Sequence, residues 1–249
     1  MENLEKERYL RQMKVAELGE EGQEKLKQST FLLIGAGGLG SPAAQLLAAS
    51  GAGRLIIADF DTVETNNLSR QFLHTDARIG MNKAESAAVA LKDVNPFTRV
   101  TPFTGKVTDE TLAPLVAEAD VVVDCCDNSK TRHVVNRVCH RLGKPLVTAG
   151  AIRGCGQISV FDFRESGTPC YACAFPEDEE NDLKASSLGV LTALTGIMGA
   201  LEAAEAVKIA AGIGSPLKGK VMLVDILNND YRIFALRSNP ACRVCRGEG

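Results

Sequence analysis

Four cysteines form two Cys-x-x-Cys pairs, and their spacing indicates a metal site. One pair is Cys170 and Cys173, and the other is Cys242 and Cys245. The two thiolates of a pair can face one centre, so the four sulfurs can complete a tetrahedral zinc shell with Zn–S bonds of about 2.3 Å. Four sulfurs leave no position open for water, so we expect a structural zinc. This zinc clip (residues 170–173 with 242–245) would tie the C-terminal segment to a loop in mid-chain. Disulfides or unrelated thiols are the alternative.

A glycine-rich turn predicts a nucleotide site near the N-terminus. The turn, Gly35-Ala-Gly-Gly-Leu-Gly40, lies between an apolar run and an Ala/Leu-rich helix. Gly35 permits the tight turn, Gly37 lets the backbone approach a phosphate, and Gly40 lets helix and strand pack closely. The helix N-terminus offers N–H groups to an anion, and Asp59 can accept hydrogen bonds from ribose hydroxyls. Glycines that serve only a turn are the alternative, and these residues alone do not separate a dinucleotide from a mononucleotide.

Further polar side chains follow the predicted strands of the same sheet. They are Asn67, Arg70 and Gln71 after the second strand, Lys83 at the start of the next helix, and Asp127 with Asn128 after the fourth strand. In an open α/β sheet, ligands bind where the carboxyl ends of the strands converge. A guanidinium, an ammonium and a carboxylate suit a triphosphate with Mg²⁺ better than nicotinamide, because Mg²⁺ is typically held by carboxylates and substrate phosphates. Each charge alone is explained by solvent exposure, but their joint placement favours a ligand site.

The elements that position these residues alternate between strands and helices. Apolar runs predict strands at 30–35, 54–59, 99–103, 120–125, 144–148, 157–163, 221–225 and 231–236, and helices are expected at 41–50, 82–93, 109–118, 129–142 and 188–211. This order predicts a Rossmann-like, doubly wound α/β fold with a mostly parallel sheet and C-terminal antiparallel strands. We expect one domain over residues 1–249, with short helices at about 4–28. The helix 188–211 is rich in small residues, so it suits either the core or a homodimer interface.

Composition excludes several classes of protein. A chain of 249 residues with 45% apolar content can bury a sizeable core. Eight cysteines without a secretory signal indicate a reducing compartment, so we expect a cytoplasmic protein. The net charge of −3 offers no electrostatic surface for nucleic acid, so no such partner is expected. The uncharged stretch from Leu188 to Leu201 is too short to cross a bilayer, so we expect no membrane span.

The combination of these motifs resembles one family over essentially the whole chain. It is similar to the bacterial relatives of ubiquitin-activating enzyme, namely the MoeB-, ThiF- and HesA-type adenylyltransferases. The residues that carry the resemblance are Gly35-Ala-Gly-Gly-Leu-Gly40, Asp59-Phe-Asp61, Asn67-Leu-Ser-Arg70-Gln71, Lys83, Asp124-Cys-Cys-Asp127-Asn128 and the two cysteine pairs.

The family's chemistry is ATP- and Mg²⁺-dependent adenylation of the C-terminal glycine carboxylate of a small ubiquitin-fold sulfur-carrier protein. The resemblance implies that Asp59 holds the ribose, that Arg70 and Lys83 contact the phosphates, and that Asp127 carries Mg²⁺. It implies a homodimer in which Arg11 reaches the partner's nucleotide. It further assigns to the nucleotide site Gly35, Gly37, Gly38, Gly40, Asp61, Asn67, Gln71 and Asn128.

One position departs from the family pattern. Several relatives have a cysteine between the acidic run Pro176–Asp182 and the following helix, and here the matching residue is Ala185. Either an external sulfur donor acts on the acyl-adenylate, or an engineered substitution removed the thiol. Cys125 and Cys126 adjoin Asp127, but buried cysteines at strand ends are usually inert. The three histidines show no metal spacing, and a structural role is expected for the one nearest the site, at position 74.

Two other functions stay open at this point. An NAD-dependent oxidoreductase explains the glycine turn and Asp59, yet it gives no role to the zinc clip, Arg70 or Lys83. A nucleotide-binding scaffold without turnover is favoured if Ala185 is the natural residue. The sequence does not identify the carrier, because molybdopterin, thiamine, tRNA-thiolation, amino-acid and natural-product pathways all use such proteins.

Overall fold

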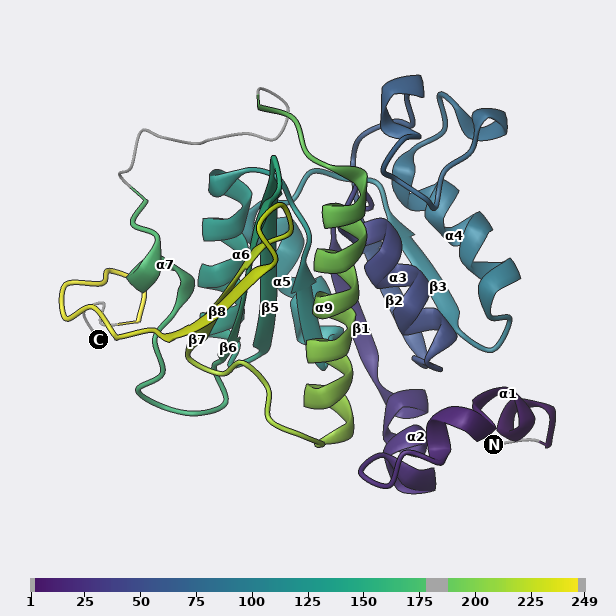
Figure 1. Ribbon diagram of the computed structural model, residues 1–249, viewed down its shortest axis with the longest axis horizontal. Coiled ribbons are helices and arrows are strands. Elements are labelled where there is room, and N and C mark those ends of the chain that lie inside the picture. The colour runs from purple at the N-terminus through teal and green to yellow at the C-terminus, as the bar shows by residue number, and fades with distance from the viewer. Residues whose placement is uncertain (1–2, 178–187, 246–249) are drawn as a thin grey trace.

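A computed structural model describes residues 3–177 and 188–245, and an eight-stranded sheet lies at its centre (Figure 1). The strand order is β3-β2-β1-β4-β5-β6-β7-β8. Ala185 and residues 178–182 of the acidic run lie outside the described residues. The expected α/β class, with a mostly parallel sheet followed by antiparallel C-terminal strands, is confirmed.

Five strands form the parallel part of the sheet. In spatial order they are β3 (Arg99–Phe103), β2 (Arg54–Ala58), β1 (Thr30–Ile34), β4 (Val121–Asp124) and β5 (Pro145–Ile152). β1 shows why the apolar runs are continuous rather than alternating. Phe31 and Leu33 pack into the core on one face, whereas Leu32 and Ile34 pack into the core on the other. Because both faces are covered, successive side chains along the strand are all buried.

The remaining strands extend the sheet as an antiparallel meander. They are β6 (Cys155–Asp162), β7 (Lys220–Asp225) and β8 (Asp230–Ala235). The strand expected at 144–148 is longer in the structure. Residues 149–152 continue β5 because they pair with residues 155–158 of β6. That pairing depends on a tight reversal at Arg153, whose φ of 53° the sequence did not indicate.

Helices cover both faces of the sheet (Figure 1). On one face lie α3 (Gly40–Ala49), α4 (Lys83–Val94) and α9 (Thr192–Ala211), and on the other lie α5 (Asp109–Glu118) and α6 (Ser129–Arg141). The expected N-terminal helices are α1 (Asn3–Met13) and α2 (Gly19–Gln28), and a short helix, α7 (Tyr171–Ala174), precedes the acidic run. Two single-turn 3-10 helices occupy Thr65–Asn67 and Asp76–Arg78. None of the described helices combines the length and the apolarity that a bilayer crossing requires.

The helix expected at 188–211 begins later, at Thr192. The preceding residues form a bridge with the β5–β6 turn instead. Arg153 N–H donates to Gly189 O and Leu191 N–H donates to Arg153 O, each at 2.8 Å. Gly189 has a φ of 74°, which suits glycine and interrupts a helix. A tertiary contact therefore overrides the helical composition of this segment, and α9 then packs within the core.

Candidate nucleotide cleft and metal site

A cleft of about 1330 Å³ opens at the carboxyl ends of the parallel strands. The cleft lies at the point where the strand order reverses, because β2 is the neighbour of β1 on one side and β4 is its neighbour on the other. Open α/β sheets bind ligands at this position. The structure brings most of the predicted site residues to this cleft. Those that line it are Gly35, Gly37, Gly38, Asp59, Asp61, Arg70, Gln71, Lys83, Asp127 and Asn128.

Two predicted residues shape the site without lining it. A Cβ at Gly40 would lie 2.0 Å from Gly35 O, so this position requires glycine for the close approach of α3 to the turn. Asn67 is buried, and its Oδ1 accepts from Glu64 N–H while its Nδ2 donates to Asn66 Oδ1. Asn67 therefore orders the loop, and the neighbouring Asn66 lines the cleft in its place.

Arg11 lies far from the cleft of its own chain. It is exposed on α1, which packs near the amino ends of the strands (Figure 1). In this packing Arg8 Nη1 donates to Val94 O at 3.0 Å, and Asn95 Nδ2 donates to the Tyr9 hydroxyl at 2.7 Å. Both contacts lie just before β3. Arg11 therefore does not join the other predicted residues in the cleft of its own chain.

Asp59 fixes the glycine turn to the end of β2. Its Oδ2 accepts from Ala36 N–H at 2.8 Å, and its Oδ1 accepts from Asp61 N–H at 2.9 Å. Burial raises the pKa of Asp59, and the two amide hydrogen bonds oppose that rise. Gly35 takes a φ of 96°, and a Cβ at Gly37 would meet only the Gln71 amide, at 3.6 Å. The backbone at Gly37 is therefore open on its cleft side.

Lys83 is directed into the cleft by the cap of α4. Asn82 Oδ1 accepts from Ala84 N–H at 2.8 Å, and its Nδ2 donates to Asp59 O at 3.0 Å. This cap makes Lys83 the first residue of the helix. The Lys83 side chain is 9% exposed, and its Nζ lies 3.0 Å from Asp61 Oδ2. Because Asp61 is 52% exposed and is its only ion-pair partner in the described part of the chain, the Lys83 ammonium can also bind a phosphate.

Arg70 and Asp127 complete the charged set on the two sides of the glycine turn. Arg70 Nη1 donates to Asn66 O at 2.9 Å, and its Cδ would lie 3.7 Å from a Cβ at Gly38. Asp127 is exposed and directly precedes Asn128, whose Oδ1 caps α6 by accepting from Thr131 N–H at 2.9 Å. Carboxylate and phosphate oxygens are the ligands that Mg²⁺ prefers, so Asp127 fits this ion when a nucleotide is bound.

Gln71 carries an acceptor without a protein partner. It is 4% exposed and lines the cleft, yet its Oε1 has no hydrogen-bond partner within residues 3–177 and 188–245. Buried polar atoms are normally satisfied. This oxygen is therefore available to a donor on a ligand.

The part of the cleft that is lined by β5, β6, α7, β7 and β8, here called the far half, contains residues that the sequence did not indicate. Arg132 on α6 is buried, its Nη2 donates to Cys126 O at 2.7 Å, and its guanidinium would lie 3.3 Å from a Cβ at Gly150 on β5. Tyr171, from the helix α7, lines the same half together with Phe234 from β8. No local motif marks these residues, because separate elements bring them together.

Burial favours the neutral forms of two thiols, Cys125 and Cys126, and of the His74 imidazole near the cleft. Burial raises the pKa of both Cys125 and Cys126 well above the ordinary value, and the Cys125 thiol donates to Glu202 Oε2 at 3.3 Å. The expectation that these cysteines are inert fits this environment. Burial likewise lowers the pKa of His74, which makes hydrogen bonds within the protein and does not line the cleft in the described structure.

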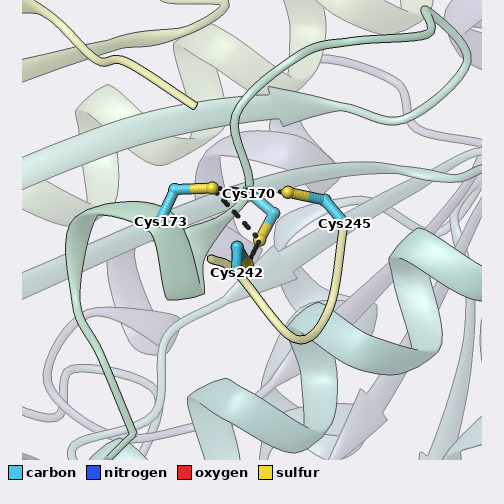
Figure 2. A group of neighbouring side chains, drawn as sticks. All are labelled: Cys170, Cys173, Cys242 and Cys245. Carbon is cyan, nitrogen blue, oxygen red and sulfur yellow. Dashed lines mark hydrogen bonds between the residues drawn. The ribbon is translucent and has the colours of Figure 1, made fainter. Parts of the chain in front are cut away.

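The four cysteines of the two pairs converge on one centre (Figure 2). Their Sγ atoms lie within 4.8 Å of one another, and the separations are 3.9 Å for Cys170–Cys173, 3.6 Å for Cys170–Cys242 and 3.3 Å for Cys173–Cys245. Zn–S bonds of about 2.3 Å in a tetrahedron place the sulfurs about 3.8 Å apart. The four cysteines are not joined by disulfides. The donor set and its spacing therefore fit a closed four-sulfur metal site.

The loop that leads from β6 to Cys170 is fixed by a buried carboxylate. Asp162 is 1% exposed and accepts from Arg164 Nη2 at 2.7 Å, and Lys218 Nζ lies 2.9 Å from its Oδ2. Burial alone would raise the pKa of Asp162, but the hydrogen bonds from Arg164 and Lys218 outweigh it and lower the pKa to about 2.

Asp162→Asn is therefore expected to lower the stability at neutral pH, by roughly 1–2 kcal/mol after allowance for the solvent-exposed partners. A lowered pKa in the folded state stabilises the protein above the unfolded-state pKa, and this contribution is lost as the pH falls toward 2. Thermal unfolding of both proteins at pH 7, 4 and 2.5 measures the difference. A gap that stays constant down to pH 2.5 would contradict the assigned ion pairs.

The sequence pattern of the ThiF family matches residues 9–244. The chain is 44% identical over 238 residues to the molybdopterin-synthase adenylyltransferase of Escherichia coli K12, covering 96% of this chain and 95% of that protein. It is also 44% identical over 241 residues to the adenylyltransferase and sulfurtransferase MOCS3 of Bos taurus, of which it covers 52%.

Solved structures share the fold. Crystal structures of E. coli MccB superpose with a TM-score of 0.84 at 25% identity for the complex with MccA-N7isoASN, covering 97% of this chain and 74% of that chain. For the complex of MccB with ATP, the TM-score is 0.79 at 27% identity, with 90% of this chain and 68% of that chain covered.

Proposed function

Because the chain belongs to the ThiF family and is an adenylyltransferase, we propose that it uses ATP and Mg²⁺ to adenylate the C-terminal glycine carboxylate of a small ubiquitin-like sulfur-carrier protein. The observation that carries this proposal is the convergence of Arg70, Lys83 and Asp127 around the open backbone of the glycine turn. The relatives named for adenylyl transfer cover almost the whole chain.

The proposed nucleotide position follows from the hydrogen-bonding groups that remain available. The phosphates lie over Gly37 and the N-terminus of α3, where the backbone is open and the helix dipole favours an anion. The ribose lies toward Asp59, whose oxygens keep lone pairs beyond their two amide hydrogen bonds. Asp127 would hold Mg²⁺, which would neutralise charge on the phosphates when bound.

The reaction joins two anions, so the cleft must offset their repulsion. A carboxylate oxygen of the carrier attacks the α-phosphorus in line, the bond from this phosphorus to the bridging oxygen breaks, and pyrophosphate leaves. Lys83 and Arg70 stabilise the negative charge that develops on the phosphoryl oxygens, and burial strengthens that interaction. Holding both reactants in one cleft removes much of the entropic cost of the encounter. The product is a mixed anhydride that an external sulfur donor can open.

The carrier tail is proposed to enter through the far half of the cleft. This half is lined by Gly150 and Gly156 on the paired strands β5 and β6, and by Leu223 and Phe234, which are exposed on the antiparallel strands. An extended Gly-Gly tail has no side chains, so its backbone can lie close to these residues.

The remaining parts of the proposal concern assembly and metal. The four-cysteine site is proposed to hold a structural zinc ion, and the chain is proposed to act as one cytoplasmic adenylation domain in a homodimer. Arg11 would then complete the cleft of the second copy, because it is exposed and remote from its own. No specific observation favours the oxidoreductase or the scaffold interpretation.

Pyrophosphate exchange tests the proposed function. Radiolabel from pyrophosphate should enter ATP only when Mg²⁺ and a carrier that ends in Gly-Gly are both present. The same carrier with its last glycine deleted is the matched control and should support no exchange. Mass spectrometry should detect the carrier with one added adenylyl group. Binding of NADH in the cleft with no binding of ATP would overturn the proposal.

A further inference from the structure

His74 connects the glycine turn to α4 although it lies outside the cleft. The side chain is 5% exposed, and both ring nitrogens have partners. Nε2 lies 2.9 Å from Ala36 O in the turn, and Nδ1 lies 2.8 Å from Ser86 Oγ on α4. Two segments that follow different strands are thus joined by one imidazole ring.

The partners determine the tautomer. A carbonyl oxygen only accepts, so Nε2 must carry the proton and donate to Ala36 O. Nδ1 of the neutral ring is then an acceptor, and Ser86 Oγ–H donates to it. Burial, which lowers the pKa of His74, favours this neutral ring.

This hydrogen bond determines the direction of the next amide. In a trans peptide the C=O of Ala36 and the N–H of Gly37 point to opposite sides of the peptide plane. The other end of Ala36 is also fixed, because its N–H donates to Asp59 Oδ2. With the carbonyl turned to His74, the Gly37 N–H faces away from His74. Gly37 lines the cleft, and its N–H donates to no acceptor in the described protein.

Ser86 connects the same network to Lys83. The two residues are three positions apart on α4, so they lie one helical turn from each other. The ring of His74 therefore fixes the spacing between the helix that carries the cleft ammonium and the turn that carries the open amide.

We propose that His74 is a positioning residue for the nucleotide phosphates, acting through Ala36 O to aim the Gly37 N–H into the cleft. This inference rests on the proposed ATP-dependent function. The hydrogen bond from Gly37 N–H to a phosphate is made both before and during the reaction. Its loss should therefore raise KM for ATP and leave kcat nearly unchanged.

Two amide variants separate the two halves of the network. The Gln side chain in His74→Gln extends to the position of Nε2, so it can still donate to Ala36 O. The shorter side chain in His74→Asn extends only to the position of Nδ1, so it can accept from Ser86 but cannot contact the turn. Both replace an aromatic ring with an amide, so they share the loss of packing.

The experiment measures ATP binding by calorimetry, KM and kcat in pyrophosphate exchange, and thermal unfolding of the full chain. We expect His74→Asn to bind ATP about 5- to 10-fold more weakly, as for one lost hydrogen bond, and His74→Gln to stay within about twofold of wild type. His140→Asn, on α6 and away from the cleft, is the control and should bind normally.

Equal weakening of ATP binding in the Gln and Asn variants, or loss of stability in both with unchanged ATP affinity, would overturn the positioning role. Failure of the wild-type protein to bind ATP would instead overturn the proposed function, so the two failures are distinguishable.

Discussion

Lys83→Ala should lower carrier-dependent pyrophosphate exchange by about 10²- to 10³-fold, the loss typical of one preorganised group that stabilises developing charge. The Lys83 side chain is 9% exposed and lies at the N-terminus of α4, where the Asn82 cap fixes its direction. Its partner Asp61 is 52% exposed, so removal of Lys83 leaves a carboxylate that water can solvate. The folding cost should therefore be small, and the effect should appear mainly in kcat.

The same helix provides the control for this experiment. Lys92 is an exposed lysine in the last turn of α4, remote from the cleft, and Lys92→Ala should retain wild-type exchange. Circular dichroism and thermal unfolding of both variants report the integrity of the fold. Exchange by Lys83→Ala within about threefold of wild type would remove this residue from the proposed machinery.

Cys242→Ser should release the metal and lower the thermal midpoint by on the order of 10 °C. Binding of a structural metal stabilises the folded chain directly, and each kcal/mol lost shifts the midpoint of a chain of this size by about 2–4 °C. Cys242 is buried, and its Sγ lies 3.6 Å from that of Cys170. Its loss therefore removes one of the four sulfur ligands from the buried side of the site. The ion determined by elemental analysis should be zinc, at one per chain.

The metal site also connects to the cleft through α7. Tyr171 and Phe175 line the cleft; Tyr171 lies between the two cysteines of the first pair, and Phe175 follows Cys173 by two residues. We therefore expect Cys242→Ser to weaken carrier-dependent exchange more than ATP binding. Cys155→Ser changes an exposed thiol outside the cluster and is the matched control for metal content and stability. Unchanged metal content in Cys242→Ser would disprove the four-sulfur site.

The sequence by itself determined the features that depend on neighbouring residues. The glycine turn follows β1 and precedes α3 because its backbone conformations and close contacts require glycine at Gly35 and Gly40. The cysteine pairs are defined by their spacing. The continuous apolar runs predicted a doubly wound sheet, and the rule that strand carboxyl ends share one edge brought Asp59 and Asp127 to the same cleft.

Only the tertiary structure decided the features that depend on long-range pairing. β5 extends to Ile152 because β6 pairs with it, and α9 begins at Thr192 because the preceding segment bridges to Arg153. Arg132 reached the cleft from α6. Each outcome is set by the free energy of contacts between distant segments, which outweighs local preference and leaves no periodic pattern in the chain.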